Sequence, residues 1–109
     1  MGEGRPIPPK RVLMIDLDLV VDEWWLQHYR RMAELILESY GLRATAIRIT
    51  PSRSKGYHAR IYLNKPVPAR FANMLQWLLC DDSPRVGFNQ ARINAGFDEW
   101  NKLFEVLRL

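Results

Sequence analysis

One apolar segment that contains two carboxylates constrains the fold of this chain more than any other feature. Residues 12–20 are VLMIDLDLV, in which aliphatic side chains alternate with Asp16 and Asp18. Alternation with a period of two places the aliphatic side chains on one face of a strand and the carboxylates on the other. We therefore predict a strand over residues 11–19 that is buried on one face only, in a sheet whose other face is open.

The rest of the chain contains segments of both common periodicities. Two short segments alternate apolar and polar residues, as amphipathic strands do, and the polar sequence PSRSKG joins them into a hairpin. Other segments repeat apolar residues every three or four positions, as helices do. The expected elements are strand 11–19, helix 22–40, strands 45–50 and 57–63, helix 68–80 with a buried stripe of Phe71, Met74, Leu75 and Leu78, and helix 98–107.

Capping and breaking residues support these bounds. Asp22 can cap the first helix, Gly41 can end it, and Pro68 can open the second. Residues 85–94, which Ser83 can cap, leave two alternatives: a helix or a short fourth strand. The order β-α-β-β-α predicts an α+β fold of the ferredoxin-like or RNA-recognition-motif-like type, an antiparallel sheet with helices packed on one face.

Length, charge and cysteine content narrow the classes of protein. The 109 residues fit one domain over residues 11–109, after a Pro- and Gly-rich flexible tail of residues 1–10. A net charge of +4 permits nucleic-acid binding, although an ordinary basic protein has the same balance. Cys80 is the only cysteine, which excludes an intrachain disulfide. With no signal-like segment and no long apolar run, we expect a cytoplasmic protein without a membrane partner.

The alternation gathers polar and charged side chains on the open face. Two carboxylates at i and i+2 of one strand can converge on a hard divalent cation such as Mg²⁺ or Mn²⁺, which prefers oxygen ligands. The alternative is that both carboxylates pair with arginines on neighbouring strands. Tyr62 is the aromatic side chain best placed for base stacking. The residues expected on this face are Asp16, Asp18, Arg48, Thr50, His58, Arg60 and Tyr62.

The hairpin loop adds positive charge next to His58. Arg53 and Lys55 lie in the loop, and Gly56 allows close approach of the backbone. Such a loop suits a triphosphate or a nucleic-acid phosphate, although an ordinary polar turn has the same composition.

Three residues near the second helix are further candidates. Asp81 can supply a third metal ligand or lie in a solvated turn. Arg85 and Arg92 are spaced to share a helical face, which can contact phosphates or simply be polar.

Two short motifs resemble those of the archaeo-eukaryotic primase and primase-polymerase superfamily. They are IDLD at residues 15–18 and GYH at residues 56–58, within a matching region of about residues 11–65. The resemblance implies that Asp16 and Asp18 bind catalytic Mg²⁺ or Mn²⁺ and that His58 contacts the phosphates of an incoming nucleotide. Members of the superfamily are generally longer and carry a third aspartate on a later strand, where this chain has Cys80 and Asp81.

Three hypotheses of function follow. The first is a nucleic-acid-binding, primase-polymerase-like domain of a viral or plasmid replication system, which if active transfers nucleotides from a nucleoside triphosphate on DNA or RNA. The second is a non-catalytic module that binds single-stranded nucleic acid or a protein, and the third is a small homodimer closed through its own open face. In the first, Asp16, Asp18 and His58 are catalytic, Arg53, Lys55, Gly56, His58 and Arg60 bind phosphate, and Arg48, Arg60, Tyr62, Arg85 and Arg92 bind nucleic acid.

Overall fold

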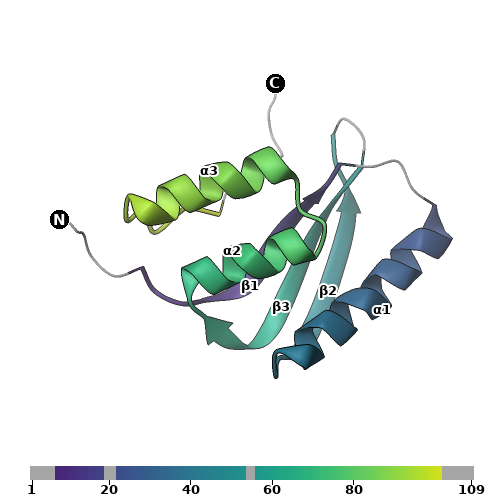
Figure 1. Ribbon diagram of the computed structural model, residues 1–109. Coiled ribbons are helices and arrows are strands. Elements are labelled where there is room, and N and C mark those ends of the chain that lie inside the picture. The colour runs from purple at the N-terminus through teal and green to yellow at the C-terminus, as the bar shows by residue number, and fades with distance from the viewer. Residues whose placement is uncertain (1–6, 19–21, 54–55, 102–109) are drawn as a thin grey trace.

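A computed structural model describes residues 7–18, 22–53 and 56–101 (Figure 1). The three strands form one antiparallel sheet in the order β1-β3-β2. The helices α1 and α2 lie over one face of this sheet, and α3 lies beside α2. The fold is α+β with a ferredoxin-like arrangement, as predicted. The elements are β1 (Lys10–Leu17), α1 (Glu23–Ser39), β2 (Ala44–Pro51), β3 (Tyr57–Val67), α2 (Ala69–Leu78) and α3 (Ser83–Asn94).

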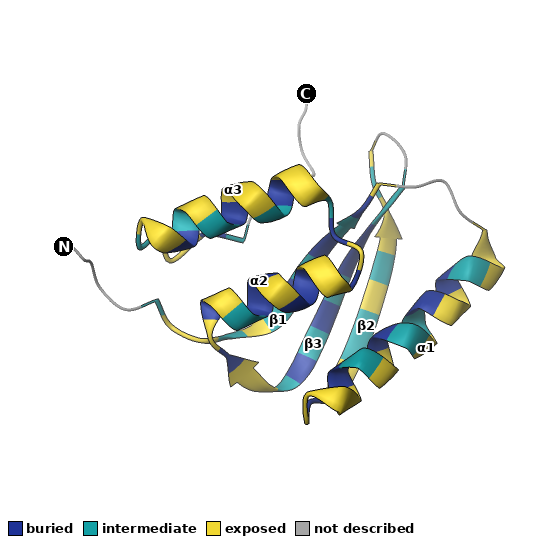
Figure 2. Ribbon diagram, in the orientation of Figure 1, coloured by how far each residue is buried: buried dark blue, intermediate teal, exposed yellow. Residues whose placement is uncertain are grey.

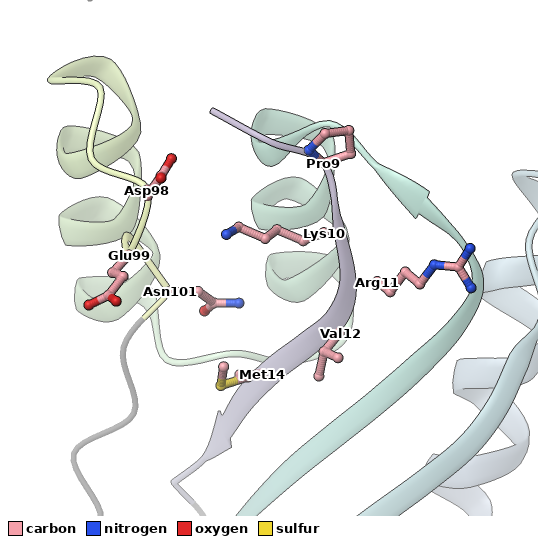
Figure 3. A pocket seen from close by; sticks show the side chains of 8 residues that line it. All are labelled: Pro9, Lys10, Arg11, Val12, Met14, Asp98, Glu99 and Asn101. Atoms are coloured by element: carbon pink, nitrogen blue, oxygen red, sulfur yellow. The ribbon is translucent and has the colours of Figure 1, made fainter. Parts of the chain in front are cut away.

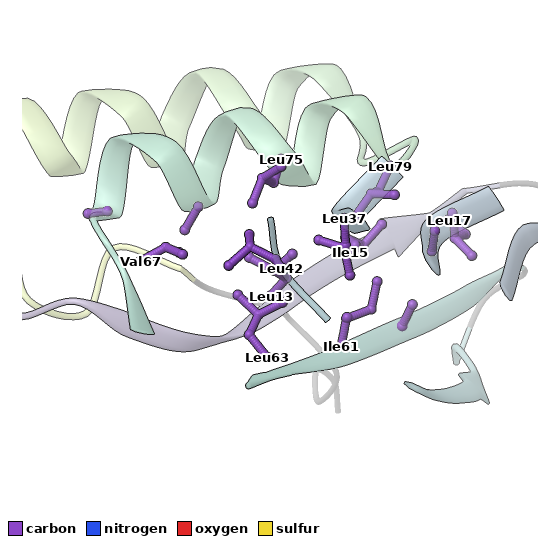
Figure 4. Packing of buried hydrophobic residues seen from close by; sticks show 14 of the residues in the cluster. Leu13, Ile15, Leu17, Leu37, Leu42, Ile61, Leu63, Val67, Leu75 and Leu79 are labelled. Atoms are coloured by element: carbon purple, nitrogen blue, oxygen red, sulfur yellow. The ribbon is translucent and has the colours of Figure 1, made fainter. Parts of the chain in front are cut away.

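The apolar face of the sheet carries the core. Figure 4 shows the leucines of α1 and α2 against the aliphatic side chains of β1 and β3. Burial alternates along β1 and β3 (Figure 2), because successive side chains of a strand point to opposite faces. The fully buried aliphatic residues of this cluster include Leu13, Ile15, Leu17, Leu37, Ile61, Leu75 and Leu79.

The helix N-termini are capped by aspartate side chains or begin after proline. Asp22 Oδ1 accepts a hydrogen bond from the backbone N–H of Trp25 at 2.9 Å, as the sequence indicates for α1. Pro68, predicted to be the first residue of α2, is instead its N-cap, and the helix begins at Ala69. The cap of α3 is Asp82, whose carboxylate accepts from the N–H of Arg85 at 3.3 Å, and the predicted cap Ser83 is instead the first residue of the helix.

All three helices end in the same motif, in which the residue after the cap adopts a left-handed conformation. This residue is Gly41 after α1 (φ +74°), Cys80 after α2 (φ +74°) and Gly96 after α3 (φ +84°). Each time its N–H and the next N–H donate back to carbonyls of the last helical turn. Two of the three positions therefore carry the residue type that the conformation favours.

Several sequence predictions are corrected here. Residues 85–94 are helical, which resolves the alternatives left open. The helix expected over 98–107 does not begin at Asp98, since residues 98–101 are turn and irregular backbone; residues 102–107 lie outside the described part. Strand β3 continues through Pro66 to Val67. Its last partner on β2 is at Leu63, which pairs with Ala44, the first residue of β2, so the missing N–H of Pro66 leaves no residue of β2 unpaired. Within the tail expected over residues 1–10, Ile7 packs against the core and Lys10 is the first residue of β1.

Candidate functional site

Six of the seven polar residues predicted for the open face lie on it in the register of the sheet, and the seventh, Asp18, follows the last residue of β1. Their register forms rows across the three strands, each centred on one residue of β3. His58 lies between Asp16 and Thr50, Arg60 between Met14 and Arg48, and Tyr62 between Val12 and Ala46. The α-helices of the described chain lie over the opposite face (Figure 1). The parity prediction therefore placed these residues correctly.

Asp16 and His58 form the first polar row. Asp16 Oδ1 lies 3.9 Å from His58 Nε2, and the imidazole is buried while the carboxylate is one-third exposed. Partial burial raises the pKa of Asp16 above its ordinary value; the nearby His58 opposes this rise and Asp18 adds to it. The carboxylate is thus held in an environment that disfavours its charged form. Such a cost is common at binding and catalytic sites.

Two arginines form the second row. Arg48 of β2 and Arg60 of β3 are direct cross-strand partners, so two guanidinium groups begin from neighbouring backbone positions. The guanidinium carbon of Arg48 lies 5.9 Å from the centroid of the Tyr62 ring, within the range of a cation–π contact. Positive charge and an aromatic ring therefore meet in the middle of the open face.

The hairpin loop is described in part. Arg53 is exposed, Gly56 has φ +83°, and the Ser52 N–H donates to the Gly56 carbonyl at 3.0 Å. The positive φ explains why glycine is required just before β3. The predicted phosphate contact Lys55 lies outside the described residues.

The carboxylate of Asp81, expected to be the third metal ligand, is occupied by hydrogen bonds to other groups of the chain. Oδ1 of Asp81 accepts from the backbone N–H groups of Asp16 and Asp82, and Oδ2 accepts from Arg85 and Gln76. Within the described ranges, no group of three His, Cys, Asp or Glu side chains is arranged to hold a metal ion. Asp16 and Asp18 thus remain two candidate ligands, and the described residues do not complete the three-aspartate set that the resemblance implies.

Asp81 and Arg85 belong instead to a polar network at the outer edge of β1. Their ion pair is almost fully buried, with Arg85 Nη1 2.5 Å from Asp81 Oδ2. Burial raises the pKa of Asp81 and lowers the pKa of Arg85, while the contact between the two groups opposes both shifts. The network also includes Gln76, Asn73, Asn89 and Asn101.

This network holds two of the four arginines predicted to bind nucleic acid, Arg85 and Arg92, away from the open face. Arg85 donates to the Met14 carbonyl at 2.7 Å and to Asn101 Oδ1 at 2.7 Å. Arg92 donates to Asn89 Oδ1 at 3.2 Å and lies near the Trp100 carbonyl. Both side chains tie α3 to neighbouring segments.

Sequence reasoning missed the network, because the predicted buried stripe of α2 does not include Asn73 and Gln76. Both amides are buried in the structure, and buried amides need hydrogen-bond partners. Gln76 finds its partners in the Met14 N–H and in Asn101.

Comparison with family models, with curated proteins and with solved structures gives no significant match to this chain. The class of protein is thus defined by its fold, a ferredoxin-like α+β domain with one open sheet face. In the described ranges, no helix combines the length and apolar character needed to span a bilayer.

Proposed function

We propose that the open face binds single-stranded nucleic acid. The observation that carries this proposal is the cross-strand pair of Arg48 and Arg60 beside the ring of Tyr62. Two guanidinium groups that start from opposite positions on neighbouring strands can contact successive phosphates of one strand, and the Tyr62 ring beside them can stack on a base. The chain's net charge of +4 favours the same class of ligand.

The shape of the site favours a single strand over a duplex. Proteins read duplex DNA mainly by inserting a helix or a ribbon into the major groove. Here the charged residues lie on a three-stranded sheet face, and the helices of the described chain pack on the other side. A sheet with basic groups and an aromatic ring suits unstacked bases, which can lie on Tyr62 while phosphates contact the arginines.

The test is the salt dependence of binding to a fluorescent single-stranded oligonucleotide of mixed sequence. Each phosphate contact that is lost lowers the slope of log affinity against log salt by about 0.7. We expect Arg48→Ala and Arg60→Ala each to lower the slope by about this amount. Arg31→Ala is the matched control, since Arg31 is an exposed arginine of α1 that pairs with Glu34 at 3.3 Å. Equal slopes in wild type and both open-face variants would contradict the proposal.

A second candidate function is metal-dependent binding of a nucleoside triphosphate at the same face, as the resemblance to primases implies. It is favoured by the proximity of Asp16 and His58, with Asp18 two residues further along the chain. We expect Mn²⁺ to bind with measurable heat in calorimetry and the Asp16→Asn, Asp18→Asn double variant to lose this heat. Identical titrations of the two proteins would exclude these carboxylates as ligands.

A further inference from the structure

The outer edge of β1 is hydrogen-bonded at two residues and open at a third. The Met14 N–H donates to Gln76 Oε1 at 2.9 Å, and the Asp16 N–H donates to Asp81 Oδ1 at 2.8 Å. Backbone groups of residues two apart in a strand point to the same side, so the N–H and C=O of Val12 face this edge as well. Within the described residues, neither group of Val12 has a hydrogen-bond partner on this side.

A groove of about 420 Å³ lies along this open part of the edge (Figure 3). One wall is β1, with the apolar side chains of Val12 and Met14. The other wall is the segment after α3, with the polar side chains of Asp98, Glu99 and Asn101. Its volume is in the range of small-ligand sites.

The groove continues the open face around the edge of the sheet. The side chains of Val12 and Met14 belong to the rows of Tyr62 and Arg60, so a strand lying on those rows reaches the groove directly. Lys10 extends from β1 toward the opposite wall, which carries Asp98 and Glu99 (Figure 3).

The open edge is too short for a peptide strand. A peptide that adds to a sheet needs a row of free backbone groups, and Gln76, Arg85 and Asp81 already occupy both groups of Met14 and the N–H of Asp16. One donor and one acceptor remain at Val12. Such a pair matches the edge of a single planar heterocycle, which presents one acceptor and one donor side by side.

We propose that this groove holds one nucleobase of the strand bound on the open face and prefers a base with an exocyclic amino group. The inference rests on the proposed function and adds base selectivity to it. Val12 N–H donates to a ring nitrogen, and the amino group donates to the Val12 carbonyl. The carboxylates of Asp98 and Glu99 accept the second amino hydrogen, as acidic side chains do from cytosine N4. Uracil and thymine carry a carbonyl oxygen there, which the carboxylates repel.

The first test uses mononucleotides, so that it does not depend on binding of a strand. Cytidine and uridine 5′-monophosphates differ at this position by an amino group against a carbonyl. We expect the cytidine compound to shift the NMR amide signal of Val12 at lower concentrations than the uridine compound does. Absence of a shift with both compounds, or equal shifts, would overturn the inference.

The second test compares oligo(dC) with oligo(dT) of equal length on wild type and on the Asp98→Asn, Glu99→Gln double variant. Both acidic residues are exposed, so the double variant should fold. Wild type should prefer oligo(dC) by about tenfold, the lower range for one good base contact, and the double variant should lose that preference.

A preference that survives in the double variant, or none in wild type, overturns the inference. Unchanged salt slopes in Arg48→Ala and Arg60→Ala instead overturn the proposed function. Tighter binding of an unrelated extended peptide than of either oligonucleotide would assign the groove to a protein partner and also overturn the inference.

Discussion

Cys80 occupies, at the end of α2, the position that glycine occupies at the ends of α1 and α3. A side chain with a Cβ atom in the left-handed region costs about 1–2 kcal/mol relative to glycine. We expect Cys80→Gly to raise the free energy of unfolding by about 1 kcal/mol, measured by urea denaturation.

The matched control for this prediction is Gly41→Ala. Gly41 has the same φ of +74° and open space around the position of an added Cβ atom. Its substitution therefore measures only the cost of placing a residue with a Cβ atom in the left-handed backbone conformation. It should lower the free energy of unfolding by about 1 kcal/mol. A destabilised Cys80→Gly variant would mean that the thiol makes a contact worth more than the backbone strain.

The carboxylate of Asp16 also works against stability. Because burial raises its pKa in the folded state, the fold favours the protonated form, and the penalty appears as the pH rises from 3.8 through the folded pKa. We expect Asp16→Asn to melt at a higher temperature than wild type near neutral pH, with a difference that shrinks toward pH 4. A difference that is constant from pH 4 to pH 7.5 would contradict this account. A charge kept at a cost to stability is expected at a functional site.

At the scale of elements, α2 shows where sequence reasoning succeeds and where it fails. The helix begins at Ala69, one residue after the predicted start. Only Leu75 of its predicted buried stripe is fully buried, and Met74 and Leu78 are exposed. The helix is rotated so that Asn73 and Gln76 reach α3 and the edge of β1. Periodicity alone could not predict this rotation, because the partners of those amides lie far away in the sequence.

The ion pair of Asp81 and Arg85 joins α2, α3 and β1. Removing one partner of a buried pair leaves an uncompensated charge, which costs about 3–5 kcal/mol. We expect Arg85→Met to lower the free energy of unfolding by that amount and to speed hydrogen exchange at the Asp16 amide. The Asp81→Asn, Arg85→Met double variant should recover part of the loss. A loss below about 1 kcal/mol in the single variant would show that the pair is not essential to the edge.

At the scale of the whole molecule, the domain is thin, with extents of 47 × 39 × 18 Å. This thickness matches one sheet and one layer of helices, so the second face of the sheet stays open. The alternation in β1 and β3 was sufficient to predict this layering and the residues on the open face. The edge network could not be predicted, because its hydrogen bonds join residues up to 71 positions apart.

The same layering bears on oligomeric state. A two-fold dimer through the open face would bring the Arg48–Arg60 pair of one copy toward that of the other, which disfavours association. We therefore expect a monomer in sedimentation velocity at both low and high salt. A dimer that persists in high salt and dissociates in Tyr62→Ala would support closure of the face by a second copy instead.

At each edge of the sheet, an arginine of a helix donates a hydrogen bond to a backbone carbonyl of the edge strand. Arg85 of α3 donates to the Met14 carbonyl of β1, and Arg30 of α1 donates to the Ile47 carbonyl of β2 at 2.7 Å. Unpaired strand edges act as templates for fibril growth, so these two guanidinium groups protect the chain from self-assembly into cross-β aggregates. That protection depends on the packing of α1 and α3 against the rest of the domain, so a variant in which either helix detaches exposes a strand edge that can template aggregation.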